Sequence, residues 1–119
     1  MKNILIIIND APYGTEKAYN AMRIANQLAK DHKENIHVRL FLMADAALCA
    51  VAGQDTPEGY YNIERMLKLS VAKGAEIGVC GTCAKARGIA ENKFVKGAKL
   101  STMPELGNWI AESDQVMTF

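Results

Sequence analysis

Residues 1–10 read MKNILIIIND, and five consecutive aliphatic residues, Ile4 to Ile8, lie inside that stretch. A continuous apolar run of this length predicts a strand buried on both faces, as in a parallel sheet. Strand and helix patterns alternate along the rest of the chain. Further strands are expected at Ile36–Met43, Ala75–Val79, Ala98–Leu100 and Gln115–Phe119. This alternation predicts right-handed βαβ units in an α/β fold, with helices on both faces of the sheet.

Start and stop signals place the helices between these strands. Thr15 is expected to cap a helix that runs to about Lys30. Thr56-Pro57 is typical of the cap and first turn of a helix over Glu58–Lys73, which Gly74 would end. Shorter helices are expected at Ala44–Val51, from Cys80 towards Gly88, and from the capping box Thr102–Glu105 to Ser113.

The composition predicts an ordinary globular protein. A length of 119 residues indicates one domain, residues 1–119, and the 50% of hydrophobic residues argues against disorder. Fourteen Lys and Arg residues against thirteen Asp and Glu residues give a formal charge of +1, so nothing indicates nucleic acid or an anionic membrane as a partner. The run Ile4–Ile8 is too short for a signal peptide, and no stretch approaches the roughly 20 apolar residues of a membrane span. We expect a cytoplasmic protein.

Three cysteines cannot all pair within one chain, which fits a reducing compartment. Two of them form the motif Cys80-Gly81-Thr82-Cys83, and in the cytosol such a pair indicates redox, sulfur or metal chemistry. A structural zinc needs four ligands, and only Cys49, His32 and His37 could supplement the pair, so we expect no metal and no cofactor. A thioredoxin-like fold fits poorly, because Pro104 begins a helix rather than preceding a strand.

Polar or reactive side chains follow three of the predicted strands. Asn9-Asp10, Asp45 and Cys80 stand at the carboxyl ends, where ligands collect in parallel sheets. Asn9, Asp10, Tyr13 and Asp45 are therefore candidate substrate-binding residues, although such residues more often cap loops. Cys49 stands in an apolar segment and is expected to be a buried small side chain.

Cys80 is the candidate nucleophile. It precedes a helix start, where free N–H groups favour an anion. Arg87, seven positions on, would share its helical face, Gly81 would allow a partner close approach, and Thr82 adds a hydroxyl. Asp45 would oppose ionisation if it lay nearby. These features predict that Cys80 is largely a thiolate at neutral pH.

A set of landmarks spans the whole chain. They are Ala11-Pro12-Tyr13-Gly14, Arg39 to Ala46, Glu58-Gly59-Tyr60, Cys80 to Cys83, Arg87-Gly88-Ile89 and Asp114 to Phe119. In this order they resemble the YchN-type branch of the DsrE/DsrF-like family. The resemblance implies a three-layer α/β/α sandwich with a mostly parallel five-stranded sheet, and a homohexamer. It also implies that Cys80 occupies the position at which sulfur-relay members accept sulfur as a persulfide, while Cys83 is a feature of this branch.

The leading hypothesis is a sulfur carrier or sulfurtransferase, with Cys80 as the persulfide-forming thiol, Arg87 and the helix-start amides as anion stabilisers, and Cys83 as a second thiol. Its partners would be small sulfur-donor and sulfur-acceptor proteins. Two alternatives stay open: a dithiol redox protein or thiol sensor that uses Cys80 and Cys83, and a non-enzymatic oligomeric binding module. Methionine and aromatic residues could serve an interface or the core, and the sequence favours the core.

Overall fold

The computed structural model describes all residues from Met1 to Phe119. Its centre is a parallel sheet in the order β4-β3-β2-β1-β5. The strands are β1 (Lys2–Ile8), β2 (Ile36–Leu42), β3 (Glu76–Cys80), β4 (Ala98–Ser101) and β5 (Gln115–Thr118). The predicted α/β class and five strands are confirmed, and every strand pairing is parallel.

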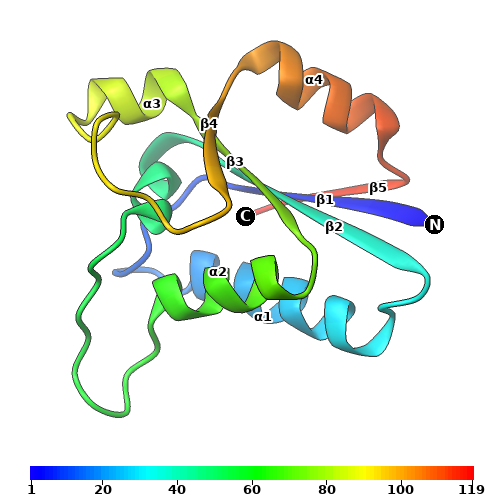
Figure 1. Ribbon diagram of the computed structural model, residues 1–119, viewed down its shortest axis with the longest axis horizontal. Coiled ribbons are helices and arrows are strands. Elements are labelled where there is room, and N and C mark those ends of the chain that lie inside the picture. Colours follow the sequence, from blue (N-terminus) through cyan, green and yellow to red (C-terminus); the bar gives the residue numbers. More distant parts are fainter.

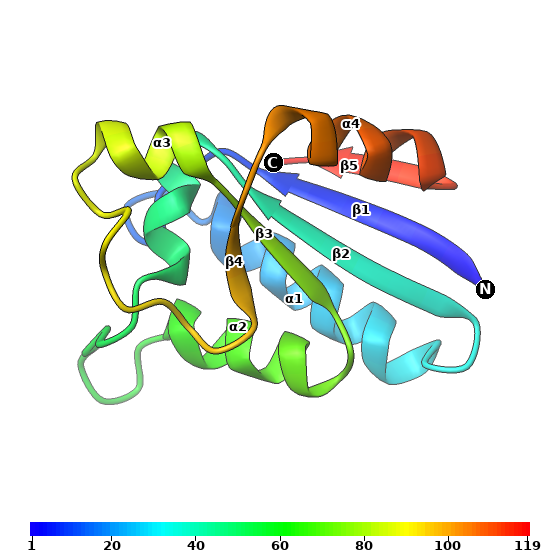
Figure 2. The ribbon, with the colours of Figure 1, turned by 45° about the horizontal axis from the view of Figure 1, so that its top comes forward.

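Helices cover both faces of the sheet. The helices α1 (Lys17–Asp31) and α2 (Ile63–Ala72) lie on one face, and α4 (Met103–Glu112) lies on the other (Figures 1 and 2). The 3-10 helix η1 (Ala44–Ala50) and the short α3 (Gly81–Ala86) pack against each other at the end where β2 and β3 finish. The arrangement is the three-layer sandwich that the resemblance implied.

Two apolar cores lie on the two faces of the sheet. The larger one joins the buried side chains of β1, β2 and β3, Ile6 and Leu40 among them, to α1 and α2. The smaller one, beneath α4, consists of Leu5, Ile7, Phe41, Cys80 and Leu106. Aliphatic residues at successive positions of β1 fill both cores in turn, because successive side chains of a strand point to opposite faces. The smaller core thus contains the candidate nucleophile.

The expected helix over Glu58–Lys73 is wrong in its first turn and a half. Residues 55–62 form an extended loop that protrudes from the domain (Figure 1), and α2 begins at Ile63. Gly59 takes a left-handed φ of 82°, which breaks a helix, and Asn62 caps α2 by accepting the N–H of Arg65 at 3.0 Å. The signal at Thr56-Pro57 is locally reasonable but is not used.

Smaller differences concern helix ends. The N-cap of α1 is Glu16 rather than Thr15, whose hydroxyl instead donates to Asp10 at 2.7 Å. Gly74 follows the C-cap of α2 with a φ of 97°, as expected, and Thr102 caps α4 by accepting the N–H of Glu105 at 3.3 Å. No helix of the chain combines the length and the apolar character that crossing a membrane requires.

Candidate functional site

Cys80 is the last residue of β3 and the N-cap of α3. Its sulfur accepts the backbone N–H of Cys83 at 3.3 Å. The residue is 9% exposed and packs in the smaller core beside Phe41 and Leu106. The predicted position at the carboxyl edge of the sheet is therefore confirmed, but the thiol is more enclosed than the sequence suggested.

The prediction that Cys80 is largely a thiolate at neutral pH is wrong for this chain. Burial raises the pKa of the Cys80 thiol, and the neighbouring Cys83 thiol raises it further. The N–H groups of Cys83 and Thr82 lower the pKa, as the sequence predicted, but they do not outweigh burial. At neutral pH the unmodified Cys80 is a neutral thiol that must lose its proton in order to react.

Cys83 stands one helical turn further along and is partly exposed. Its sulfur accepts the backbone N–H of Ala44 at 3.1 Å. Ala44 begins η1 directly after the end of β2, and it is the non-glycine residue of the chain with a positive φ, 52°. Sequence reasoning missed Ala44, because an alanine carries no signal for a left-handed backbone, whereas a glycine or asparagine would.

Arg87 does not contact Cys80, in contrast to the prediction that the two share one helical face. Its Nε and Nη2 both lie 2.9 Å from Oδ1 of Asp45, and its Nη1 donates to the carbonyl of Cys83 at 3.1 Å. The difference arises because α3 ends at Ala86, so that Arg87 is a C-cap residue rather than part of the helical face. Asp45 and Arg87 therefore neutralise each other and connect η1 to α3.

Gly81 and Thr82 separate the two thiols. A Cβ on Gly81 would lie 3.1 Å from the carbonyl oxygen of Ser101 in β4, so the close approach of that strand favours glycine. Thr82 is exposed. Ser101 is the strand partner of Cys80, and its hydroxyl donates to Glu105 at 2.5 Å.

The other candidate binding residues hold loops. The side chain of Asn9 donates to the carbonyl of Phe119 at 3.2 Å, and Asp10 accepts the Thr15 hydroxyl. The hydroxyl of Tyr13 donates to Gln54 at 2.6 Å. None of these contacts involves Cys80 or Cys83, whereas Asp45 is connected to the carbonyl of Cys83 through Arg87.

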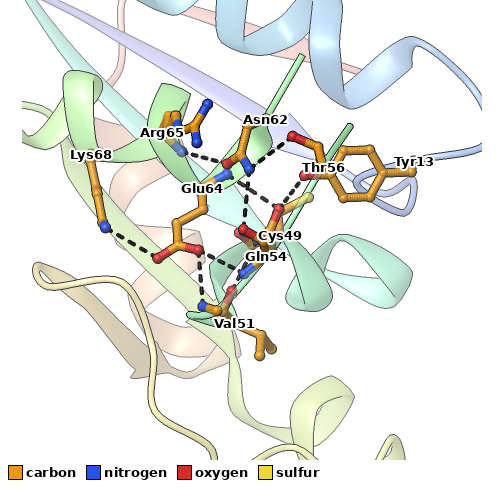
Figure 3. A network of polar contacts seen from close by, with 10 residues as sticks. Tyr13, Cys49, Val51, Gln54, Thr56, Asn62, Glu64, Arg65 and Lys68 are labelled. Carbon is orange, nitrogen blue, oxygen red and sulfur yellow. Dashed lines mark hydrogen bonds and ion pairs between the residues drawn. The ribbon is translucent and has the colours of Figure 1, made fainter. Parts of the chain in front are cut away.

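A buried polar network holds the far end of η1 (Figure 3). Glu64 accepts the N–H groups of Gly53 and Gln54 at 2.9 and 2.8 Å and pairs with Lys68 at 3.2 Å. Burial alone would raise the pKa of Glu64, but the N–H of Gln54, the Lys68 ammonium and the N–H of Gly53 together lower it. The Gln54 amide in turn donates to the carbonyls of Cys49 and Val51, at 2.9 and 3.0 Å. The network therefore fixes the helix that begins with Ala44.

The remaining thiol and the histidines lie apart from this site. Cys49 is fully buried in the larger core, as predicted, and burial raises its pKa to about 12. His37 pairs with Glu76 at 2.5 Å. No three His, Cys, Asp or Glu side chains are grouped so that they could hold a metal ion.

The model of the DsrE/DsrF-like family matches residues 2–119. Protein YchN of Escherichia coli (strain K12) is 39% identical over 119 residues, which is 100% of both chains. An uncharacterized protein of Methanopyrus kandleri is 40% identical over 116 residues, 98% of this chain and 93% of its own. The crystal structure of the ychN protein from E. coli matches with a TM-score of 0.94 and 100% coverage of both chains.

Proposed function

The chain belongs to the DsrE/DsrF-like family, and from that premise we propose that it carries sulfur as a persulfide on Cys80 and passes it to a partner thiol. The observation that carries the proposal is the position of the Cys80 sulfur. Cys80 ends β3 at the carboxyl edge of the sheet. Its sulfur accepts the N–H of Cys83, and the thiol of Cys83 lies beside it. Such a site fits a reaction that needs one nucleophilic sulfur and an N–H group that stabilises negative charge on that sulfur.

Loading is a thiol–persulfide exchange. Cys80 loses its proton and attacks the outer sulfur of a persulfide donor, whose S–S bond breaks and whose thiolate leaves with the electron pair. The product is Cys80 persulfide, which is a stronger acid than the thiol. The Cys83 N–H, which is directed at Sγ of Cys80, would stabilise the Cys80 thiolate that attacks the donor and that leaves when the acceptor takes the outer sulfur. Attack of an acceptor thiolate on the outer sulfur returns Cys80 to its first state.

The test is a loading experiment. The reduced protein is incubated with a cysteine desulfurase and radiolabelled cysteine, and protein-bound sulfur that a reductant releases is counted. All variants carry Cys83→Ser, so that no second thiol can displace the bound sulfur. In this background we expect labelling of the otherwise unchanged chain and of Cys49→Ser, and none of Cys80→Ser. Equal labelling of Cys80→Ser and of the otherwise unchanged chain in this background would refute the role of Cys80.

A second candidate is a dithiol redox protein or thiol sensor, which the proximity of Cys80 and Cys83 favours. The two functions differ in their need for Cys83. A redox protein loses its activity equally with Cys80→Ser and Cys83→Ser, whereas loading of sulfur requires Cys80 alone.

We further propose that the chain works as a homo-oligomer, the hexamer that the family resemblance implies. Support comes from large apolar side chains that are exposed beside the site: Leu100 in β4 is 48% exposed and Met103 at the start of α4 is 60% exposed. They flank Ser101, the strand partner of Cys80, and β4 has a free edge that a second copy would cover. Light scattering should give the mass of an oligomer, and a smaller one for Leu100→Lys. A wild-type monomer at micromolar concentration would contradict this.

A further inference from the structure

The sulfur of Cys83 is held by a distant part of the chain. The N–H of Ala44 donates to it at 3.1 Å, although 39 residues separate the two in sequence. An N–H directed at sulfur stabilises negative charge there and fixes the direction of the side chain. Nothing in the loading step uses this contact, because loading takes place on Cys80.

The backbone of Ala44 adopts an unfavourable conformation in making this contact. Its φ of 52° is left-handed, which the Cβ of an alanine disfavours. The neighbouring backbone holds it on both sides: Met43 donates to the carbonyl of Ile8 at 3.0 Å, and Ala46 donates to that of Met43 at 3.0 Å. Strained residues that their surroundings hold in this way cluster at functional sites.

The next residue, Asp45, holds the same helix from the other side. It binds Arg87 at 2.9 Å, and Arg87 donates to the carbonyl of Cys83 at 3.1 Å. Two adjacent residues of η1 therefore fix Cys83, one directly at its sulfur and the other through its carbonyl. Cys83 in turn donates its own N–H to the sulfur of Cys80 at 3.3 Å, so the two thiols keep a defined relation.

On the premise that Cys80 carries a persulfide, we propose that Cys83 resolves it, that the outer sulfur leaves as hydrosulfide, and that the Ala44 amide positions Cys83 for this step. The Cys83 thiolate attacks Sγ of Cys80, the inner sulfur. The bond between the inner and outer sulfur breaks, and the outer sulfur takes the electron pair.

The step is balanced within the protein. The Cys83 sulfur is oxidised from a thiolate to one half of the Cys80–Cys83 disulfide, the outer sulfur is reduced to hydrosulfide, and the Cys80 sulfur keeps its oxidation state. The proton lost by Cys83 passes to water and then to the product. A small-molecule thiol restores the dithiol by exchange. The reaction adds a route by which the carried sulfur leaves as a free ion when no acceptor protein is bound.

The test follows a single turnover. Reduced wild type, Cys83→Ser and Cys49→Ser are mixed with glutathione persulfide, freed of small molecules on a desalting column, and followed by intact-protein mass and by a hydrosulfide probe. In the wild type and in Cys49→Ser we expect the added sulfur to disappear, one hydrosulfide to appear for each, and a disulfide to form. In Cys83→Ser we expect the added sulfur to stay on Cys80, with complete loss of release.

The possible failures are distinct. If neither the wild type nor Cys83→Ser gains sulfur, the proposed function itself is wrong. If both gain sulfur and keep it equally long, the function stands and the resolving role of Cys83 is overturned. Release of hydrosulfide by Cys83→Ser at the wild-type rate would overturn it too.

Ala44 as a positioning residue needs its own readout. Ala44→Val keeps the N–H, but a β-branched side chain strongly disfavours a left-handed φ, so the backbone is driven to turn the N–H away from Cys83. We expect the variant to load sulfur to the same extent as the wild type and to release it several times more slowly. An unchanged release rate would show that the Ala44 amide does not position Cys83.

Discussion

Replacement of Ala44 by glycine should stabilise the protein, although it lies next to the candidate thiols. A left-handed alanine costs about 1–2 kcal/mol relative to an ordinary backbone conformation, and glycine removes this cost. Glycine also gives the unfolded chain more freedom, which costs about 0.4–1 kcal/mol. The difference predicts a gain of about 0.5–1 kcal/mol in the free energy of unfolding. For a chain of this length, that corresponds to a rise in Tm of roughly 2–5 °C.

Gly88→Ala is the matched control. Gly88 has a φ of 70°, and a Cβ added there meets nothing within 4 Å, so the variant changes only the backbone preference. It should lose about 1 kcal/mol, with the sign opposite to that of Ala44→Gly. Both are measured by urea unfolding of the reduced protein, with the m-value as a check for a common transition. A loss of stability in Ala44→Gly would refute the claim that the backbone at Ala44 is strained.

Three further predictions concern titrating groups. The rate of alkylation of Cys80 by iodoacetamide, measured in a Cys83→Ser background, should rise with pH through a midpoint above about 8.5, because burial raises the pKa of Cys80. A midpoint below this value would contradict the structure. Glu64→Gln should destabilise the fold by about 1–2 kcal/mol at neutral pH, through loss of a charged acceptor for two N–H groups. Since the pKa of Glu64 is lowered in the folded chain, the stability that its carboxylate contributes is present above about pH 4.3 and is lost as the pH falls through the folded pKa. Urea unfolding at lower pH should therefore show a smaller difference in stability between the wild type and Glu64→Gln. Burial raises the pKa of the Cys49 thiol to about 12, so ionisation of this thiol favours the unfolded chain. Above about pH 9 the free energy of unfolding should fall by about 1.4 kcal/mol per pH unit, and Cys49→Ala should show a shallower dependence on pH.

The positions of the strands along the chain could be predicted because the pattern that specifies each strand is local. The aliphatic run in β1 fills both cores, and Gly74 and Thr102 end and begin helices by contacts within a few residues. The start of α2 could not be predicted in this way. Tyr60 and Tyr61 precede it and lie against Tyr13, with ring centroids 6.2 and 5.6 Å away. That long-range contact keeps the segment extended despite its helical start signal.

The candidate site, like the fold, could be predicted only where local sequence patterns determine it. The positions of Asp45 and Cys80 at the carboxyl edge of the sheet follow from the parallel direction of the strands, which the alternation of strands and helices in the sequence indicates. The pKa of Cys80 depends on its burial beneath α4, beside Leu106, and burial is a property of packing. The partner of Arg87 depends on where a six-residue helix ends, which helical spacing alone does not reveal.

The most direct test of the sulfur-carrier account is to locate the bound sulfur in the Cys83→Ser variant after incubation with a cysteine desulfurase and cysteine. The protein is alkylated without reduction, digested and analysed by mass spectrometry. The account predicts that the peptide containing Cys80 gains the mass of one sulfur atom and that the peptide containing Cys49 does not. Absence of that gain, or its presence on Cys49 instead, would contradict the central claim.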